Sequence, residues 1–117
     1  MSLKDKLSDV SDHFKKKELK ISGNMKLKTL RKQFKEAFGC TLRIYNGKRF
    51  ANVEYTLAKI RKGGTDQKFT LKANWKVIDV EDKFKEVFGI TVQIALPDDS
   101  ELADNNLTIG QVARKTQ

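Results

Sequence analysis

Hydrophobic and polar residues follow the same order twice along the chain, with an offset of 50 residues. Segment 30–44, LRKQFKEAFGCTLRI, aligns without a gap with segment 80–94, VEDKFKEVFGITVQI, and seven of its positions are identical. An internal repeat of this kind assigns one structural unit to both parts of a chain. We therefore predict two repeat units, 18–61 and 68–111, within a single domain and joined by a linker at 62–67.

Each unit has the pattern of a strand, a helix and a second strand. In the first unit, Leu19 and Ile21 alternate with polar residues, as in a half-buried strand. The apolar positions of 27–38 then recur at intervals of three and four residues, which predicts an amphipathic helix. A second strand follows at 41–45 with its own alternation. The second unit predicts strands at 69–72 and 90–94 around a helix at 77–88.

The ends of the two main helices carry residues typical of caps. Asn24 and Asn74 precede the helices, where an asparagine side chain can accept a free backbone N–H. Asp79 is a second candidate for this role in the later helix. Gly39 and Gly89 follow the last apolar positions, and we expect both to end the helices in the left-handed conformation.

Further segments surround this repeated core. Short helices are predicted after each unit's second strand, at about 53–62 and 107–115, and an amphipathic helix at 2–15 precedes the first unit. The linker at 62–67 contains two adjacent glycines, which favour a flexible connector. The predicted class is α+β, with one four-stranded sheet and its helices packed on one face. The ferredoxin-like arrangement is the familiar form of this order, but the long helical connection leaves the strand order open.

The repeated core itself resembles proteins of a known kind. Segment 24–39, NMKLKTLRKQFKEAFG, is similar to small uncharacterised bacterial tandem-repeat proteins, and the resemblance covers most of the chain. It implies two strand-helix-strand units in tandem. It implies no activity, cofactor or partner.

The residue types that catalysis and metal binding require are scarce. Cys40 is the only cysteine and His13 the only histidine, so neither a disulfide nor a zinc site can be built within the chain. Ile90 occupies the position of Cys40 in the second unit, which favours a buried, unreactive thiol. The acidic residues of 98–104 lack the spacing of a calcium loop, and no phosphate-binding glycine motif is present. We predict a protein that is not an enzyme and holds no metal or cofactor.

No targeting or membrane segment stands out. The chain has no apolar run of about 18 residues, and its first residues, MSLKDKL, lack the apolar stretch of a secretory signal. These observations predict a cytoplasmic protein that does not enter a membrane.

The charge is concentrated in the first half of the chain. The formal net charge is +9, and residues 1–66 contain 17 lysines and arginines against seven acidic residues, whereas residues 67–117 contain seven against eight. Such asymmetry favours a polyanionic partner such as nucleic acid, although a basic surface can also serve solubility alone. A third interpretation is self-association, in which the basic half docks on the acidic segment 98–104 of another copy.

Alternation and helical periodicity select the residues that we expect to contact a polyanion. Successive residues of a strand point to opposite faces of the sheet, so every second residue faces the helices and the residues between them face away. The polar side of a helix faces solvent. Contacts of this type go to backbone phosphates and carry little sequence preference. The candidates are Lys20 and Arg43 on the open sheet face, Tyr45 beside them as a stacking ring, Arg31 and Lys32 on the first helix, and Lys48 and Arg49 after the second strand.

One short stretch resembles a motif of RNA-recognition domains. Segment 48–55, KRFANVEY, is similar to RNP1, which carries base-stacking aromatics. Arg49 stands in place of the family's glycine and Asn52 in place of its central aromatic. Because the stretch also lies beyond the second predicted strand, we do not expect an RNA-recognition domain. The positions that match are Lys48, Phe50, Ala51, Val53 and Tyr55.

Overall fold

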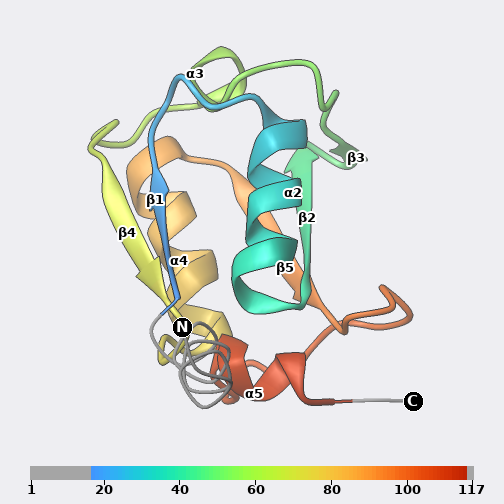
Figure 1. Cartoon of the computed structure of the whole chain (residues 1–117). Coiled ribbons are helices and arrows are strands. Elements are labelled where there is room, and N and C mark those ends of the chain that lie inside the picture. Colours follow the sequence, from blue (N-terminus) through green and yellow to red (C-terminus); the bar gives the residue numbers. More distant parts are fainter. Residues whose placement is uncertain (1–16, 116–117) are drawn as a thin grey trace, which may run out of the picture.

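Strands and helices alternate along residues 17–115, the part of the chain that the computed structural model describes (Figure 1). The elements are β1 (Glu18–Ile21), α2 (Leu27–Phe38), β2 (Thr41–Asn46), β3 (Arg49–Phe50), α3 (Leu57–Ile60), β4 (Phe69–Lys72), α4 (Val77–Phe88), β5 (Thr91–Ala95) and α5 (Ile109–Ala113). The predicted α+β class is confirmed. The helix predicted at 2–15 lies outside the described residues.

The strands form two antiparallel sheets. β1 pairs with β4, β2 pairs with β5, and the short β3 pairs with the other edge of β2. The single four-stranded sheet predicted from the sequence is therefore not formed. The alternation within a strand specifies which face is buried, but it does not specify which strand lies alongside.

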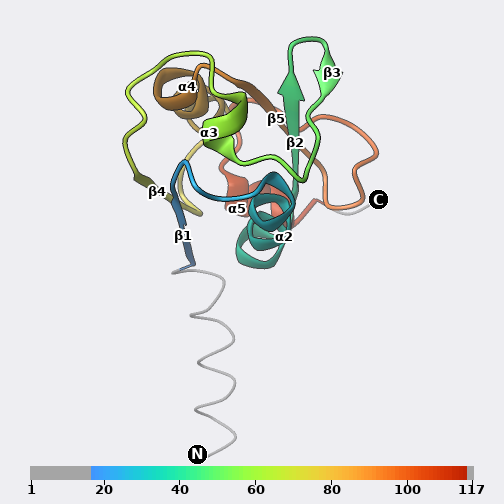
Figure 2. The same ribbon diagram turned by 90° about the horizontal axis from the view of Figure 1, so that it is seen from above.

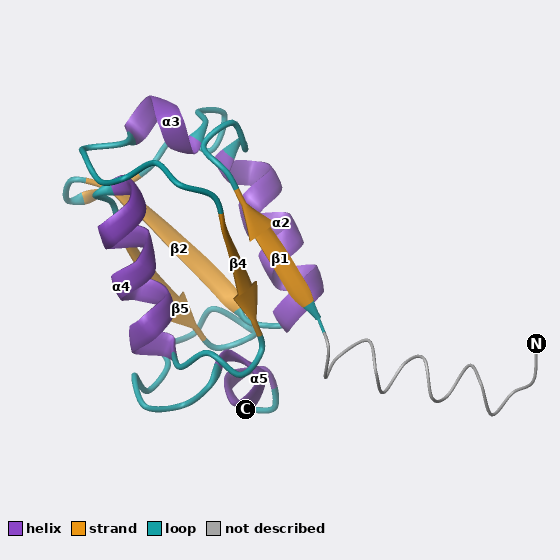
Figure 3. Ribbon diagram, turned by 90° about the vertical axis from the view of Figure 1, so that its left-hand side faces the viewer, coloured by secondary structure: helices purple, strands orange, loops and turns teal. Residues whose placement is uncertain are grey.

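Two strand pairs and two helices surround one core. Figures 2 and 3 show the β1–β4 pair and the β2–β5 pair on opposite sides of the molecule, with α2 and α4 closing the two sides between them. The helices thus lie between the sheets rather than together on one face of a sheet. Buried residues from both sheets and both helices belong to one hydrophobic cluster.

The apolar stripes of α2 and α4 are their buried faces. Phe34 packs edge-on against Phe38, with ring centroids 5.1 Å apart. Both helices end as predicted, at Gly39 with φ 80° and Gly89 with φ 66°. The buried residues are Leu27, Leu30, Phe34, Ala37 and Phe38 on α2, and Val77, Val80, Phe84, Val87 and Phe88 on α4.

The prediction that Asn24 and Asn74 cap these helices is wrong. Lys26 and Lys76 occupy the N-cap positions, and neither side chain makes a capping hydrogen bond. Backbone carbonyls from the loops before α3 and α5 satisfy the free N–H groups of the first helical turns instead. The pairs are Leu27 N with Tyr55 O at 2.8 Å, Lys28 N with Val53 O at 2.9 Å, Val77 N with Leu107 O at 2.8 Å and Ile78 N with Asn105 O at 3.2 Å.

The segment predicted as a flexible linker packs against the C-terminus of α4. Lys62 N donates to the carbonyl of Phe88, and Asp66 N donates to the carbonyl of Val87, each at 2.9 Å. Gly64 has φ +81°, and a Cβ atom at this position would lie 2.3 Å from the carbonyl oxygen of Val87. Only glycine allows this approach. The two glycines therefore serve a close contact between backbones.

The shorter elements differ from their predicted extents. α3 and α5 span four and five residues, because threonine N-caps start them later than the apolar pattern suggests. Thr56 accepts from Lys59 N, and Thr108 forms a capping box with Gln111. β3 was not predicted, since two residues are too few to show an alternation.

Candidate functional site

A stacked pair of aromatic rings lies on the hairpin formed by β2 and β3. Tyr45 is paired with Phe50 across the hairpin, so the two side chains lie on the same face. Their ring centroids are 5.1 Å apart and the rings are inclined by only 22°. The Tyr45 hydroxyl donates to Gln93 Oε1 at 2.7 Å, and this hydrogen bond fixes the position of the Tyr45 ring. Phe50 is 68% exposed, so the pair offers an aromatic surface to solvent.

Arg43 lies on β2, two residues before Tyr45, and is held by an acidic loop from the second half of the chain. Its Nε donates to Asp99 Oδ1 at 2.8 Å, and its Nη2 donates to the main-chain carbonyl of Asp99 at 2.9 Å. The hydrogen bond to the Asp99 carboxylate raises the pKa of Arg43. Asp99 has φ +61°, an uncommon conformation outside glycine, and it places carboxylate and carbonyl on the same guanidinium.

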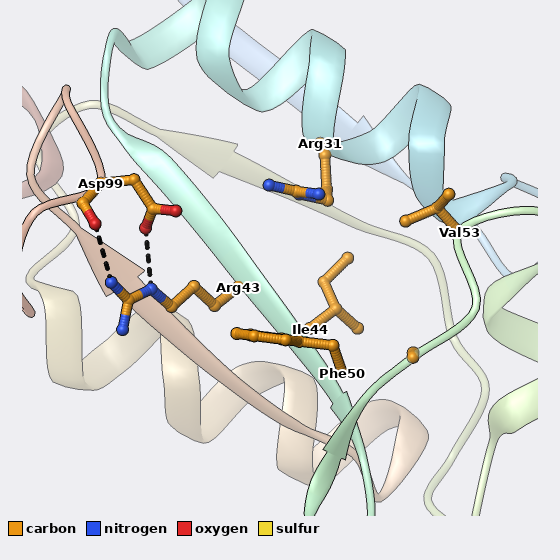
Figure 4. A pocket seen from close by; sticks show the side chains of 7 residues that line it. Arg31, Arg43, Ile44, Phe50, Val53 and Asp99 are labelled. Atoms are coloured by element: carbon orange, nitrogen blue, oxygen red, sulfur yellow. Dashed lines mark hydrogen bonds and ion pairs between the residues drawn. The ribbon is translucent and has the colours of Figure 1, made fainter.

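A hollow of about 200 Å³ lies between α2, β2 and the chain that follows β3. We call it the Phe50 hollow (Figure 4). Arg31 reaches over it from α2, and its Nε donates to the carbonyl of Leu42 at 3.1 Å. The buried side chain of Ile44 and the ring of Phe50 provide its apolar surface. Its lining residues are Arg31, Arg43, Ile44, Phe50, Ala51, Val53 and Asp99.

A second, more open hollow of about 410 Å³ continues along β2. Arg31 and Asp99 line both hollows, so the two hollows adjoin, and together we call them the β2 groove. The groove follows the edge of β2 at 41–44, where no strand among the described residues pairs on the α2 side. The second hollow is lined by Arg31, Lys32, Lys35, Thr41, Leu42, Pro97, Asp98 and Asp99.

The structure brings together most of the residues predicted to contact a polyanion. Arg31, Lys32 and Arg43 line the β2 groove. Tyr45 lies under Phe50, and the exposed residues Lys48 and Arg49 belong to the adjoining hairpin. Four of the predicted residues therefore lie in or beside one groove, and Lys48 and Arg49 lie on the neighbouring hairpin without lining it.

Lys20 is the exception. It lies on β1, paired with Thr70 of β4, in the sheet that does not contain β2. The prediction that Lys20 and Arg43 project from one shared sheet face is therefore wrong, because it depended on a single four-stranded sheet. Lys20 remains exposed, but it lines a separate hollow with Lys68 and Phe69.

Three further residues complete the groove. Phe50 matched the RNP1 pattern in the sequence but was not selected as a contact residue. Lys35, on the same side of α2 as Arg31, donates from Nζ to the carbonyl of Pro97. Asp99 was assigned from the sequence to a contact with another copy, and no sequence signal pairs it with Arg43, 56 residues earlier.

Three basic side chains of the groove, those of Arg31, Lys32 and Lys35, form no ion pair with residues 17–115, although Asp98 and Asp99 also line it. Among residues 17–115, Arg43 is the only one of the predicted basic contact residues that forms an ion pair, with Asp99. At the positions of α4 that correspond to Arg31 and Lys32 stand Glu81 and Asp82. The positive groove is therefore a property of the first half of the chain, as the charge distribution indicated.

The described residues contain neither an exposed thiol nor a set of metal ligands. Burial raises the pKa of Cys40 to about 12, which keeps the thiol protonated in the core. Residues 17–115 contain no cluster of three histidine, cysteine or acidic side chains that could hold a metal ion. None of the helices in the same range is both long and apolar enough to span a bilayer.

Comparison with known proteins finds no matching family model, no matching curated protein and no matching solved structure. The resemblance to uncharacterised bacterial repeat proteins stays a prediction. The function must therefore be argued from the groove itself.

Proposed function

We propose that the protein is a non-catalytic module that binds single-stranded nucleic acid through the β2 groove and the β2–β3 hairpin. One observation carries this proposal: an aromatic ring that is 68% exposed, Phe50, adjoins a groove in which three basic side chains of α2 form no ion pair with residues 17–115. Proteins that bind single strands combine a basic groove for the phosphates with aromatic rings for the bases.

The basic side chains would contact the phosphates. Arg31 and Lys32 line the groove, and the exposed residues Lys48 and Arg49 lie on the adjoining hairpin without lining either hollow. Each phosphate neutralised releases counterions, so each contact contributes about 0.7 to the slope of log affinity against log salt for a single strand. Binding should therefore weaken steeply as salt is added.

The ring of Phe50 would stack on a base. Its outer face is free for contact because Tyr45 supports only the inner face, and Tyr45 is itself fixed by Gln93. Base faces are accessible in single strands and in loops but not within a duplex. The exposed ring thus favours a single strand over a double helix.

The alternative is self-association or a protein partner through the acidic segment 98–104. Asp99 is already bound to Arg43 of the same chain, and Lys35 contacts Pro97 in the same loop. One acidic side chain of this segment is therefore already paired within the molecule, and its loop already contacts the basic half of the same chain. For this reason we place nucleic acid first.

We also infer that the chain is a tandem repeat. Three features support this: α2 and α4 have the same length, both end at a glycine, and both sheets pair residues 50 positions apart at their centres. These central pairs are Lys20 with Thr70 and Arg43 with Gln93. If the units diverged from one ancestor, the groove arose on one of them by the placement of Arg31 and Lys32.

The binding test uses fluorescence anisotropy with labelled oligouridine, oligothymidine and a duplex of equal length, over a series of salt concentrations. The variant Arg31→Glu/Lys32→Glu changes the groove, and Lys76→Glu/Lys85→Glu, on exposed lysines of the α4 side, makes the same charge change elsewhere. We expect the groove variant to lose most of the affinity and the control to lose little. Phe50→Ala should weaken single-strand binding by about fivefold or more while leaving the salt slope unchanged.

Two results would contradict the proposal. One is no binding by the unaltered protein at low salt. The other is equal weakening by the groove variant and by its charge-matched control, which would indicate attraction to the net charge alone. If size-exclusion profiles instead show oligomers that disappear in Asp98→Asn/Asp99→Asn, the self-association alternative gains support.

A further inference from the structure

The Phe50 hollow has features that a phosphate contact alone does not need. We propose that it is a subsite for one unstacked base, that it prefers guanine, and that Asp99 sets this preference. The inference rests on the proposed binding of single-stranded nucleic acid and adds a base preference to it.

The size and surface of the hollow fit one ring system. Its volume of about 200 Å³ is below the roughly 300 Å³ at which pockets for drug-sized ligands begin. Ile44 and Ala51 are buried and form an apolar floor with Val53. Phe50 supplies an exposed aromatic wall, on which the face of a base can stack.

Two polar groups face this space from different elements. Asp99 uses Oδ1 to hold Arg43, and its other carboxylate oxygen points toward the side of the hollow where Arg31 lies (Figure 4). Arg31 uses Nε to bind the carbonyl of Leu42, and its terminal amino groups make no hydrogen bond with residues 17–115. The hollow therefore presents a carboxylate acceptor and a guanidinium donor next to an aromatic surface.

Guanine matches this pair of groups better than the other bases. Its N1–H and N2–H₂ are adjacent donors that suit a carboxylate, and its O6 and N7 are adjacent acceptors that suit a guanidinium. Adenine, cytosine and uracil also have acceptors for a guanidinium, but adenine and cytosine each have one amino group and uracil has one ring N–H as donor. Each therefore offers the carboxylate one donor group where guanine offers two adjacent ones. A base with one donor group forms fewer hydrogen bonds to the carboxylate, which then recovers less of its desolvation cost.

The presence of the Asp99 carboxylate in the groove favours base recognition over phosphate binding alone. A groove that only attracts phosphate is weakened by a negative charge in its wall, yet Asp99 lies in the wall of this one. Holding Arg43 accounts for one carboxylate oxygen. The second oxygen is the one that would read the base.

The test compares oligouridine with the same oligomer carrying one central guanosine, adenosine or cytidine, by anisotropy. The variant is Asp99→Asn, and Asp98→Asn is its control, because it removes the same charge one residue away. Asp98 does not line the Phe50 hollow, and its carboxylate accepts from Ser100 N at 3.1 Å. We expect the unaltered protein to bind the guanosine oligomer at least about fivefold more tightly than oligouridine.

The variants separate base recognition from a structural role. Asp99→Asn should bind the guanosine oligomer and oligouridine with equal affinity, whatever the absolute affinity, whereas Asp98→Asn should keep the guanosine preference. Equal affinity of the unaltered protein for all oligomers, or the same loss of preference in both variants, would overturn the inference. A loss of affinity in Asp99→Asn that is the same for every oligomer, with the guanosine preference retained, would also overturn it, because Asp99 would then act only by holding Arg43.

The outcome is distinguishable from failure of the proposed function. If no oligomer binds at low salt, the strand-binding proposal fails, and the subsite is judged on mononucleotides. NMR titration with guanosine monophosphate should then shift the amide signals of Phe50 and Ala51 more than titration with uridine monophosphate does. Equal or absent shifts with the two nucleotides would refute the subsite.

Discussion

Replacing Gly64 by alanine tests the contact between the 62–66 loop and α4. The new Cβ would lie 2.3 Å from the carbonyl oxygen and 2.4 Å from the carbonyl carbon of Val87. Both are backbone atoms of the last turn of α4, so no flexible side chain can move aside. The loop must therefore leave α4, or the end of the helix must shift.

The expected cost follows from what the loop would lose. Undocking breaks the hydrogen bonds from Lys62 N to Phe88 O and from Asp66 N to Val87 O, each worth about 1 kcal/mol net. A left-handed alanine adds about 1 kcal/mol. The ion pair between Arg61 and Asp66 is exposed and adds little. We expect Gly64→Ala to lower the free energy of unfolding by about 2–3 kcal/mol.

Gly47→Ala is the matched control. Gly47 has φ +67°, but a Cβ atom there meets nothing within 4 Å, so only the backbone cost of about 1 kcal/mol applies. Urea unfolding followed by circular dichroism gives both values, and amide exchange at Lys62 and Asp66 reports undocking directly. Equal destabilisation by the two variants, with both amides still protected, would refute the account of the loop.

Two further predictions concern the core and a half-buried carboxylate. Phe88→Ala should lower the free energy of unfolding by about 3–5 kcal/mol in urea titrations, because Phe88 is fully buried. Phe50→Ala, which removes an exposed ring, should lower it by about 1 kcal/mol. Similar costs for the two variants would contradict the assignment of the core. Burial raises the pKa of Glu81, so the unfolded state ionises first as pH rises, and this group's contribution to stability falls as pH rises through and above the usual carboxyl range. The stability of Glu81→Gln relative to the unaltered protein should therefore increase over that range, and a difference independent of pH would contradict the shift.

Helices were predicted well from the sequence because each carries its own information. The apolar stripe from Leu27 to Phe38 fixes the buried face, and Gly39 marks the end, so local spacing is sufficient. The caps were missed because the groups that satisfy the first turn of α2 are backbone carbonyls of Val53 and Tyr55, and any residue type can supply these. The sheets were missed for a similar reason, since Leu19 and Ile21 are buried equally well with or without β2 alongside.

The site residues that local spacing determines were predicted correctly, and those that depend on contacts between distant segments were not. Arg31 and Lys32 could be placed on the exposed side of a helix by periodicity, and Arg43 and Tyr45 on one strand face by alternation. Lys20 was misplaced because its position relative to Arg43 depends on sheet pairing. Interactions between distant segments, such as the one that brings Asp99 to Arg43, leave no periodic pattern.

The strand pairing also determines how the molecule can fold. Each of the pairs β1–β4 and β2–β5 joins strands about 50 residues apart and takes one strand from each half of the chain. Neither half can complete a sheet alone, so we expect both to unfold in one cooperative transition. Closing such long loops costs entropy before any strand contact forms, which slows folding relative to a helical bundle of equal size. In an interrupted synthesis, the first half would expose the inner faces of β1, α2 and β2 until β4, α4 and β5 followed.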